Sequence, residues 1–237
     1  MMISAMVTAR DAEATLDACL ASLAGCTRIS EIIVLIDDRT TDTSRDIAQG
    51  HASHVFEAPF RDYASFKNEG IGHCSAEWIL ILDSDEMLEL ALAEEIAALT
   101  LANPETSYAI PFKNHLRGRW MRFGGLYPDY HTRLVHRSQA SYHGNVHESL
   151  GNPYQLVTLN HHILHYGYLS WGHLFEKCRH YARLERGHRG QSFLKAGAHG
   201  LRRFLTIYIK KGGLLDGIDG FVHAVALGYY QWVKYSG

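Results

Sequence analysis

The first hundred residues alternate apolar runs with segments in which apolar residues recur at helical spacing. Residues 32–36 (IIVLI) and 78–82 (WILIL) are apolar at every position, as is typical of strands covered on both faces. The expected elements are strands over residues 3–8, 32–36, 54–57 and 78–82, and helices from residue 16, toward residue 49, over 63–71 and over 88–99. Alternation of this kind with short connections predicts an α/β fold with a doubly wound, mostly parallel sheet.

The second half of the chain has a different pattern. Short β-like segments are expected over residues 108–112, 132–136 and 163–166, and helices follow from residue 170, interrupted by Gly187, Gly190 and the pair Gly212-Gly213. We expect one catalytic domain over residues 1–169, with halves at about 1–100 and 101–169. A helical C-terminal extension over residues 170–237 should follow it.

Composition restricts the function classes. The formal net charge of the 237 residues is −2, so the chain lacks the basic footprint of nucleic-acid binding. Its cysteines are scattered without a CxxC pair, and we expect them to be reduced thiols. No signal peptide and no uncharged run of membrane-spanning length is visible. We therefore expect a cytoplasmic protein.

Acidic residues follow both fully apolar strands. Asp37 and Asp38 end the first, and Asp83-Ser84-Asp85 follows the second as a DxD motif. In open parallel sheets, ligands bind beyond the carboxyl ends of the strands. One carboxylate of the motif can accept a hydrogen bond from a ribose hydroxyl, and the other can hold Mg²⁺ or Mn²⁺, which prefer carboxylates together with substrate phosphates. The sequence thus predicts a nucleotide site with a divalent cation.

Four segments in this half of the chain resemble glycosyltransferase family 2, whose members have the GT-A fold. They are VTARD at residues 7–11, EIIVLIDDRTTDTS at 31–44, SFKN at 65–68 and WILILDSDE at 78–86. Two of them depart from the usual motifs: a lysine replaces the commoner arginine in SFKN, and the first loop lacks the usual Thr, Asn, Glu sequence. The resemblance covers residues 3 to about 99.

The resemblance implies a role for each matching position. Thr8 and Arg10 would lie beside the nucleotide, and Asp37 would contact the base or ribose. Lys67 would lie near the base or diphosphate. The DxD motif would complete the nucleotide-sugar site, with Asp83 facing the ribose, Ser84 between the acids, and Asp85 binding the metal. Two of these positions have a simpler alternative: Asp37 could be a turn or helix-capping acid, and Lys67 could be a solvated helix lysine. Asp42 is better interpreted as a capping acid than as a ligand.

The second half resembles the bacterial lipopolysaccharide-core β-glucosyltransferases, in the segments WMRFGGLYPDYHTRLVHR, NVHE and GGLLDGIDGFVHAVALGYYQWVKY. This resemblance implies transfer of glucose or a similar hexose from a UDP-sugar to a lipid-anchored glycan. An inverting transfer needs one general base. Glu148 is our first candidate and Asp129 the second. Either acid could instead pair with Arg133 or Arg137, and Glu86 could merely orient the DxD loop.

The C-terminal helices mix basic residues with apolar and aromatic ones. This pattern suits either packing on the domain or peripheral contact with an anionic membrane, at the inner face of the cytoplasmic membrane. Two other function classes were weighed. A nucleotidyltransferase would need a glycine-rich phosphate loop after the first strand, and residues 8–12 (TARDA) contain no glycine. The sequence does not dismiss a sugar-nucleotide-binding protein without catalysis, although the intact Asp83, Asp85 and Glu148 argue against it.

Overall fold

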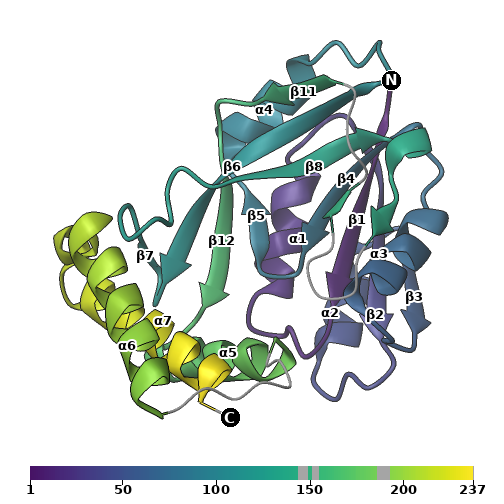
Figure 1. Cartoon of the computed structure of the whole chain (residues 1–237). Helices are drawn as coiled ribbons and strands as arrows, with labels where there is room; N and C mark the ends of the chain where they lie inside the picture. Colours follow the sequence, from purple (N-terminus) through teal and green to yellow (C-terminus); the bar gives the residue numbers. More distant parts are fainter. Residues whose placement is uncertain (144–148, 151–154, 186–192, 237) are drawn as a thin grey trace. The chain divides into compact units, whose positions relative to one another are not determined.

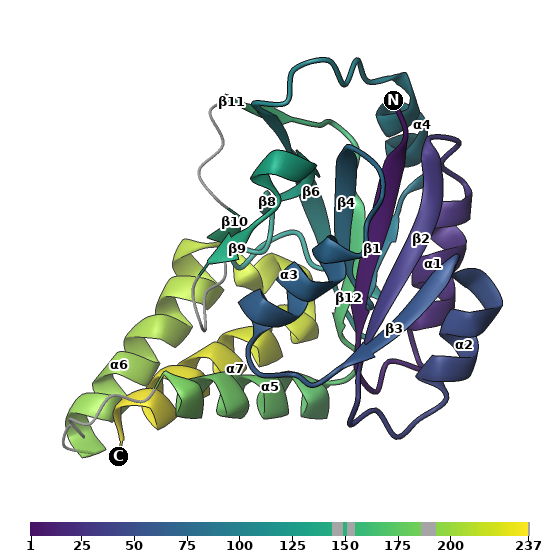
Figure 2. The same ribbon diagram turned by 90° about the vertical axis from the view of Figure 1, so that its right-hand side faces the viewer.

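The computed structural model describes residues 1–143, 149–150, 155–185 and 193–236 (Figures 1 and 2). The chain divides into two compact units. The first contains residues 1–112 and 130–165, and the second contains residues 113–129 and 166–237. The predicted boundary at residue 169, between a catalytic domain and a helical extension, stays a prediction.

Four parallel strands form the first part of unit 1. They pair in the order β3-β2-β1-β4. The strands are β1 (Ile3–Ala9), β2 (Ile29–Asp37), β3 (His54–Ala58) and β4 (Trp78–Asp83), and the helices that connect them are α1 (Leu16–Ala24), α2 (Ser44–His51) and α3 (Tyr63–Gly72). The predicted strand–helix alternation and α/β fold are confirmed. Each of the four strands is also longer than its predicted range by one or more residues.

Helices cover both faces of these strands, as Figure 2 shows for α1 and α2 on one side and α3 on the other. Alternate residues of β1 enter different cores: Ala5 and Val7 pack with α1 and α2, whereas Met6 packs with residues of α3. A strand buried on both faces must be apolar throughout. This explains why the central strands lack the alternation of a half-exposed sheet.

Polar side chains fix two of the helix starts. Asp62 accepts a hydrogen bond from the backbone N–H of Ser65 at 2.8 Å and caps α3. Asp42 accepts from the backbone N–H and the hydroxyl of Ser44, at 2.9 and 2.6 Å, at the start of α2. The structure therefore places Asp42 where a capping acid was expected.

Antiparallel strands extend the sheet beyond β4. Strand β8 (Tyr130–His136) pairs with β4, and β6 (Thr106–Leu116) pairs with β8. Strand β11 (Gln155–Thr158) runs parallel to β6. The short strand β5 (Glu86–Leu88) pairs with β12 (Ile163–Tyr168), so the helix predicted from residue 88 begins two residues later, as α4 (Leu90–Ala98). Strands β9 (Tyr142–His143) and β10 (Ser149–Leu150) form a separate pair.

Unit 2 is mainly helical, as predicted for the residues after 170. Its elements are β7 (Arg119–Trp120), α5 (Trp171–Leu184), α6 (Phe193–Leu205), a π-helical turn (Thr206–Lys210), a 3-10 turn (Gly213–Asp216) and α7 (Gly217–Tyr235). Asp216 accepts hydrogen bonds from the backbone N–H groups of Arg122 and Phe123, which ties the loop after β7 to these helices. Among the described residues, none of the helices combines the length and apolar character that crossing a membrane requires.

Candidate functional site

The candidate site lies where the strand order of the parallel sheet reverses. Strand β1 is central: the chain proceeds outward to β2 and β3 on one side and returns to β4 on the other. Thr8 near the end of β1 is in register with Leu35 of β2 and Asp83 of β4. The carboxyl ends of β2, β1 and β4 thus share one edge of the sheet. Ligands of doubly wound sheets bind at such a switch point.

Asp83 is held by three side chains from different elements. Its Oδ1 accepts a hydrogen bond from the Thr8 hydroxyl at 3.1 Å and lies 3.0 Å from the Lys67 Nζ. Its Oδ2 lies 3.3 Å from the Arg133 Nη2. Partial burial alone would raise the pKa of Asp83, but the charges of Lys67 and Arg133 hold it well below the ordinary aspartate value. Asp83 is therefore ionised at neutral pH.

Lys67 is buried, with only 4% of its surface exposed, and Tyr142 lies beneath its ammonium at 5.2 Å from the ring centroid. The alternative of a solvated helix lysine is therefore wrong. Helix α3 presents the side chain inward because its other buried residues, among them Phe66 and Ile71, face the sheet. Burying an ammonium is expensive unless a counter-ion is present. Asp83 supplies that counter-ion.

Glu86 lies beneath the DxD loop and is almost fully buried. Its carboxylate accepts a hydrogen bond from Arg133 and another, at 3.2 Å, from the backbone N–H of Asp83. Burial raises the pKa of Glu86, and the charge of Arg133 opposes this rise. These contacts fit the expected role of Glu86 in orienting the loop. They also show Arg133 paired with carboxylates, one of the two roles weighed for it.

Asp85 lies beside a histidine. Strand pairing places His165 opposite Glu86, and the Asp85 Oδ2 is 3.6 Å from the His165 Nε2. Within the described part of the chain, no group of three or more His, Cys, Asp or Glu side chains is arranged to hold a metal. Mg²⁺ and Mn²⁺ usually take one or two protein ligands and complete their coordination with substrate phosphates and water. The pair Asp85 and His165 fits a cation of that kind.

Asp37 is completely buried and ion-paired. Arg39 donates to both of its carboxylate oxygens, at 3.0 and 2.7 Å, and the Arg10 Nη1 lies 3.5 Å away. The hydrogen bonds from Arg39 lower the pKa of Asp37, with a smaller effect from the charge of Arg10. Both arginine side chains remain about half exposed. This edge of the sheet therefore presents guanidinium groups that suit an anionic ligand.

The structure brings together some of the predicted site residues but not all of them. Thr8, Lys67 and Asp83 are in direct contact, and the backbone N–H of Ser84 donates to the carbonyl of Thr8 at 3.2 Å. Arg10 joins Asp37. Asp129 belongs to unit 2, where the Asn114 Nδ2 donates to its carboxylate at 3.0 Å. Glu148 lies outside the described residues.

Sequence reasoning missed the part played by Arg39. The signal was present, because an arginine two residues after a strand-ending acid can fold back onto it. For Arg133, the two roles open from the sequence were a clamp on phosphate or an anionic acceptor and a pairing with nearby carboxylates. Its position 50 residues beyond Asp83 gives no local indication of which carboxylate it meets.

Comparisons with known proteins bear on the family and on the fold. The family described as Glycosyl transferase family 2 matches residues 4–151. The lipopolysaccharide core biosynthesis glycosyltransferase LpsC of Rhizobium meliloti (strain 1021) is 25% identical, covering 98% of this chain and 89% of the relative. An uncharacterized glycosyltransferase of Rickettsia bellii (strain RML369-C) is 21% identical, covering 98% and 84%. The structure of S. aureus TarS 1–349 in complex with UDP-GlcNAc superposes with a TM-score of 0.50 at 15% identity, covering 94% of this chain and 79% of TarS.

Proposed function

The chain belongs to glycosyl transferase family 2 and is a glycosyltransferase, and from this premise we propose that it transfers a hexose, with inversion, from a UDP-sugar to a glycan acceptor. The proposed hexose is glucose, and the proposed acceptor is a sugar of the lipopolysaccharide core or a similar cell-envelope glycan. The acceptor proposal follows the sequence resemblance and the relative LpsC, which is named a lipopolysaccharide core biosynthesis glycosyltransferase. The proposed location is the cytoplasm, at the inner face of the cytoplasmic membrane.

One observation carries the proposal: the ionised carboxylate of Asp83 lies at the switch point of the sheet, in contact with Thr8 and Lys67, with Asp85 two residues further on. A carboxylate has about four acceptor positions, so Asp83 can accept a ribose hydroxyl in addition to its protein partners. Arg10 and Arg39 at the same edge offer donors to a nucleotide diphosphate.

Asp85 and His165 would hold the divalent cation. When bound, such a cation neutralises negative charge on the leaving diphosphate. His165 must be neutral at its Nε2 to act as a ligand, and the carboxylate of Asp85 must be ionised. We retain Asp85 as the main ligand because a carboxylate is the harder donor of the two and suits Mg²⁺ and Mn²⁺ better.

A base must also accept the proton of the attacking hydroxyl. We keep Glu148 as the first candidate and Asp129 as the second. Glu148→Gln should bind donor normally but lose turnover, since the substitution removes only the capacity to accept a proton. Normal turnover in Glu148→Gln combined with loss in Asp129→Asn would assign the base to Asp129. The alternatives of a nucleotidyltransferase or a non-catalytic binding protein have no observation in their favour.

The donor and metal proposals are tested by thermal unfolding of the protein with a panel of nucleotide sugars, with and without Mn²⁺. A ligand that binds only the folded state stabilises it by about 2.7 kcal/mol at a hundredfold excess over its dissociation constant. A UDP-hexose should raise the unfolding temperature most when Mn²⁺ is present. Asp85→Ala should abolish the Mn²⁺-dependent part, whereas Asp38→Ala, an exposed acid at the end of β2, should keep it.

Two results would count against the proposal. If no UDP-sugar stabilises the wild-type protein with Mn²⁺, the proposed donor is wrong. If Asp85→Ala responds to Mn²⁺ as the wild type does, the assignment of Asp85 as the metal ligand is wrong, even where the donor itself binds.

A further inference from the structure

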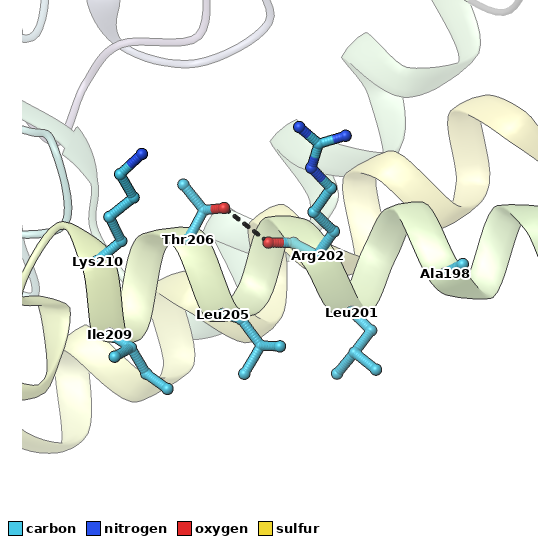
Figure 3. Close-up of a pocket in the computed structure, with 7 residues that line it drawn as sticks. All are labelled: Ala198, Leu201, Arg202, Leu205, Thr206, Ile209 and Lys210. Carbon is cyan, nitrogen blue, oxygen red and sulfur yellow. Dashed lines mark hydrogen bonds between the residues drawn. The ribbon is translucent and has the colours of Figure 1, made fainter.

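An apolar stripe runs along the outer face of α6. Leu194, Leu201, Leu205 and Ile209 recur at intervals of seven and four residues, and each exposes 42–83% of its surface. Figure 3 shows Leu201, Leu205 and Ile209 pointing to the same side of the helix. These residues, except Leu194, also line an open hollow of about 470 Å³ on this helix. Exposed leucines in a contiguous row mark interaction sites far more often than isolated ones do.

The stripe continues onto the start of α7. The Phe221 ring lies 5.8 Å from the ring of Phe204 on α6 and 5.6 Å from the ring of Tyr208 in the π-helical turn that follows α6. Ile218, one helical turn before Phe221, is 57% exposed. Leu214 and Leu215 are exposed in the intervening 3-10 turn. We call this combined surface of unit 2 the apolar ridge.

The inner face of α6 is already occupied. Ala196 and Gly200 are buried against α7, and a Cβ atom at Gly200 would come within 2.9 Å of the carbonyl oxygen of Gly228. Such close packing fixes the rotation of α6 on α7. The stripe therefore cannot turn inward to join the core of unit 2 without breaking this contact.

The exposed charged residues of the segments that form the ridge are basic, because the two acids among them, Asp216 and Asp219, are buried. Residues 193–215 contain five lysines and arginines and no aspartate or glutamate, within a chain whose formal net charge is −2. Arg202 and Lys210 are exposed, and Figure 3 shows them leaving the helix on the side away from the leucines. Lys195 lies seven residues before Arg202 and is also exposed. Long basic side chains on the polar side of a helix can bend toward phosphate groups while the opposite, apolar side is buried.

We propose that the apolar ridge docks on the surface of an anionic lipid bilayer. A helix with an apolar face and basic residues beside it lies in the membrane interface, with the apolar side chains between the acyl chains. Anionic headgroups supply the charge that complements residues 195, 202 and 210. A second copy of this chain is a poorer occupant, because a two-fold interface would place the basic segment of one copy against that of the other.

The proposal concerns unit 2 and does not rest on the proposed reaction. It is tested by co-sedimentation of the full chain with vesicles of phosphatidylglycerol and phosphatidylcholine, or of phosphatidylcholine alone. The wild type should bind the anionic vesicles and be released by salt. The triple variant Leu201→Gln/Leu205→Gln/Ile209→Gln should bind at least tenfold more weakly. Each substitution in Arg202→Gln/Lys210→Gln should weaken binding about fivefold.

A matched control removes equally exposed apolar groups elsewhere: Leu90→Gln/Leu156→Gln, in unit 1, should bind vesicles as the wild type does. The stabilisation of every variant by nucleotide should also be measured, since its retention shows that unit 1 is folded and separates this proposal from the proposed function. Absence of wild-type binding to anionic vesicles, or equal loss in the control variant, would overturn the proposal. So would a wild-type dimer that the triple variant dissociates while vesicle binding persists.

Discussion

Removing the ammonium of Lys67 should destabilise the fold and disturb the candidate site, because Asp83 loses one of its counter-ions. The Lys67 Nζ lies 3.0 Å from the Asp83 Oδ1, and the lysine is almost fully buried. We expect Lys67→Met to destabilise the protein, because a methionine of similar length keeps the packing but leaves Asp83 with Arg133 and the hydroxyl of Thr8 as its partners. The change therefore isolates the charge.

The magnitude can be bounded from the geometry. Two unit charges 3.0 Å apart attract by about 5 kcal/mol at an effective dielectric constant of 20. The side chain of Asp83 is 34% exposed, so solvent screens the pair, and Arg133 shares the same carboxylate. Removing one member of a fully buried pair costs roughly 3–5 kcal/mol. A coupling of about 2 kcal/mol between Lys67 and Asp83 is the expected value.

The assay is urea unfolding of four proteins: the wild type, Lys67→Met, Asp83→Asn and the double variant. The pKa of Asp83 is lowered in the folded state, so its contribution is complete above about pH 4, the ordinary aspartate value, and is lost as pH falls toward the folded pKa. The coupling should be present at pH 7 and smaller at pH 3. A coupling below about 0.5 kcal/mol at pH 7, typical of an exposed pair, would refute the reasoning.

Two further predictions concern unit 2. Burial, assisted by the charge of Arg203, lowers the pKa of His223 to about 4, so stability should fall as pH drops from 6.5 toward 4. Between pH 7 and pH 5 the wild type should lose about 2 kcal/mol more than His223→Gln in urea unfolding, and parallel losses would contradict this. Gly200→Ala should destabilise the protein by about 1–3 kcal/mol, because the Cβ of the new alanine would meet the Gly228 carbonyl. Gly197→Ala is the control: the space around Gly197 is open, so this change should be neutral or stabilising in thermal unfolding.

The fold of the first hundred residues could be predicted because local and global signals agree there. The runs IIVLI and WILIL are apolar at every position because both faces of their strands are buried. The sequence therefore indicates that helices cover both faces of the sheet. The second half was harder. Strand β5, three residues long, forms because β12 pairs with it from more than seventy residues away, and no local pattern distinguishes it from the start of a helix.

The candidate site shows the same division between local and distant information. The DxD motif and the apolar run before it predict that Asp83 and Asp85 lie at the end of a strand, at the edge of the sheet where ligands bind. The different surroundings of the two acids could not be predicted from this local pattern, because they come from distant elements. The cations beside Asp83 come from α3 and β8, and His165 beside Asp85 comes from β12.

These surroundings favour a different proposed role for each acid. A divalent cation at Asp83 would face the ammonium of Lys67 and the guanidinium of Arg133, and like charges at such short distances repel. Asp85 has as its neighbour a histidine, a residue type that can itself bind a metal through a ring nitrogen. The same arrangement keeps Asp83 ionised as an acceptor for a hydroxyl. Electrostatics alone therefore favours Asp85 over Asp83 as the metal ligand, independently of any likeness to other proteins.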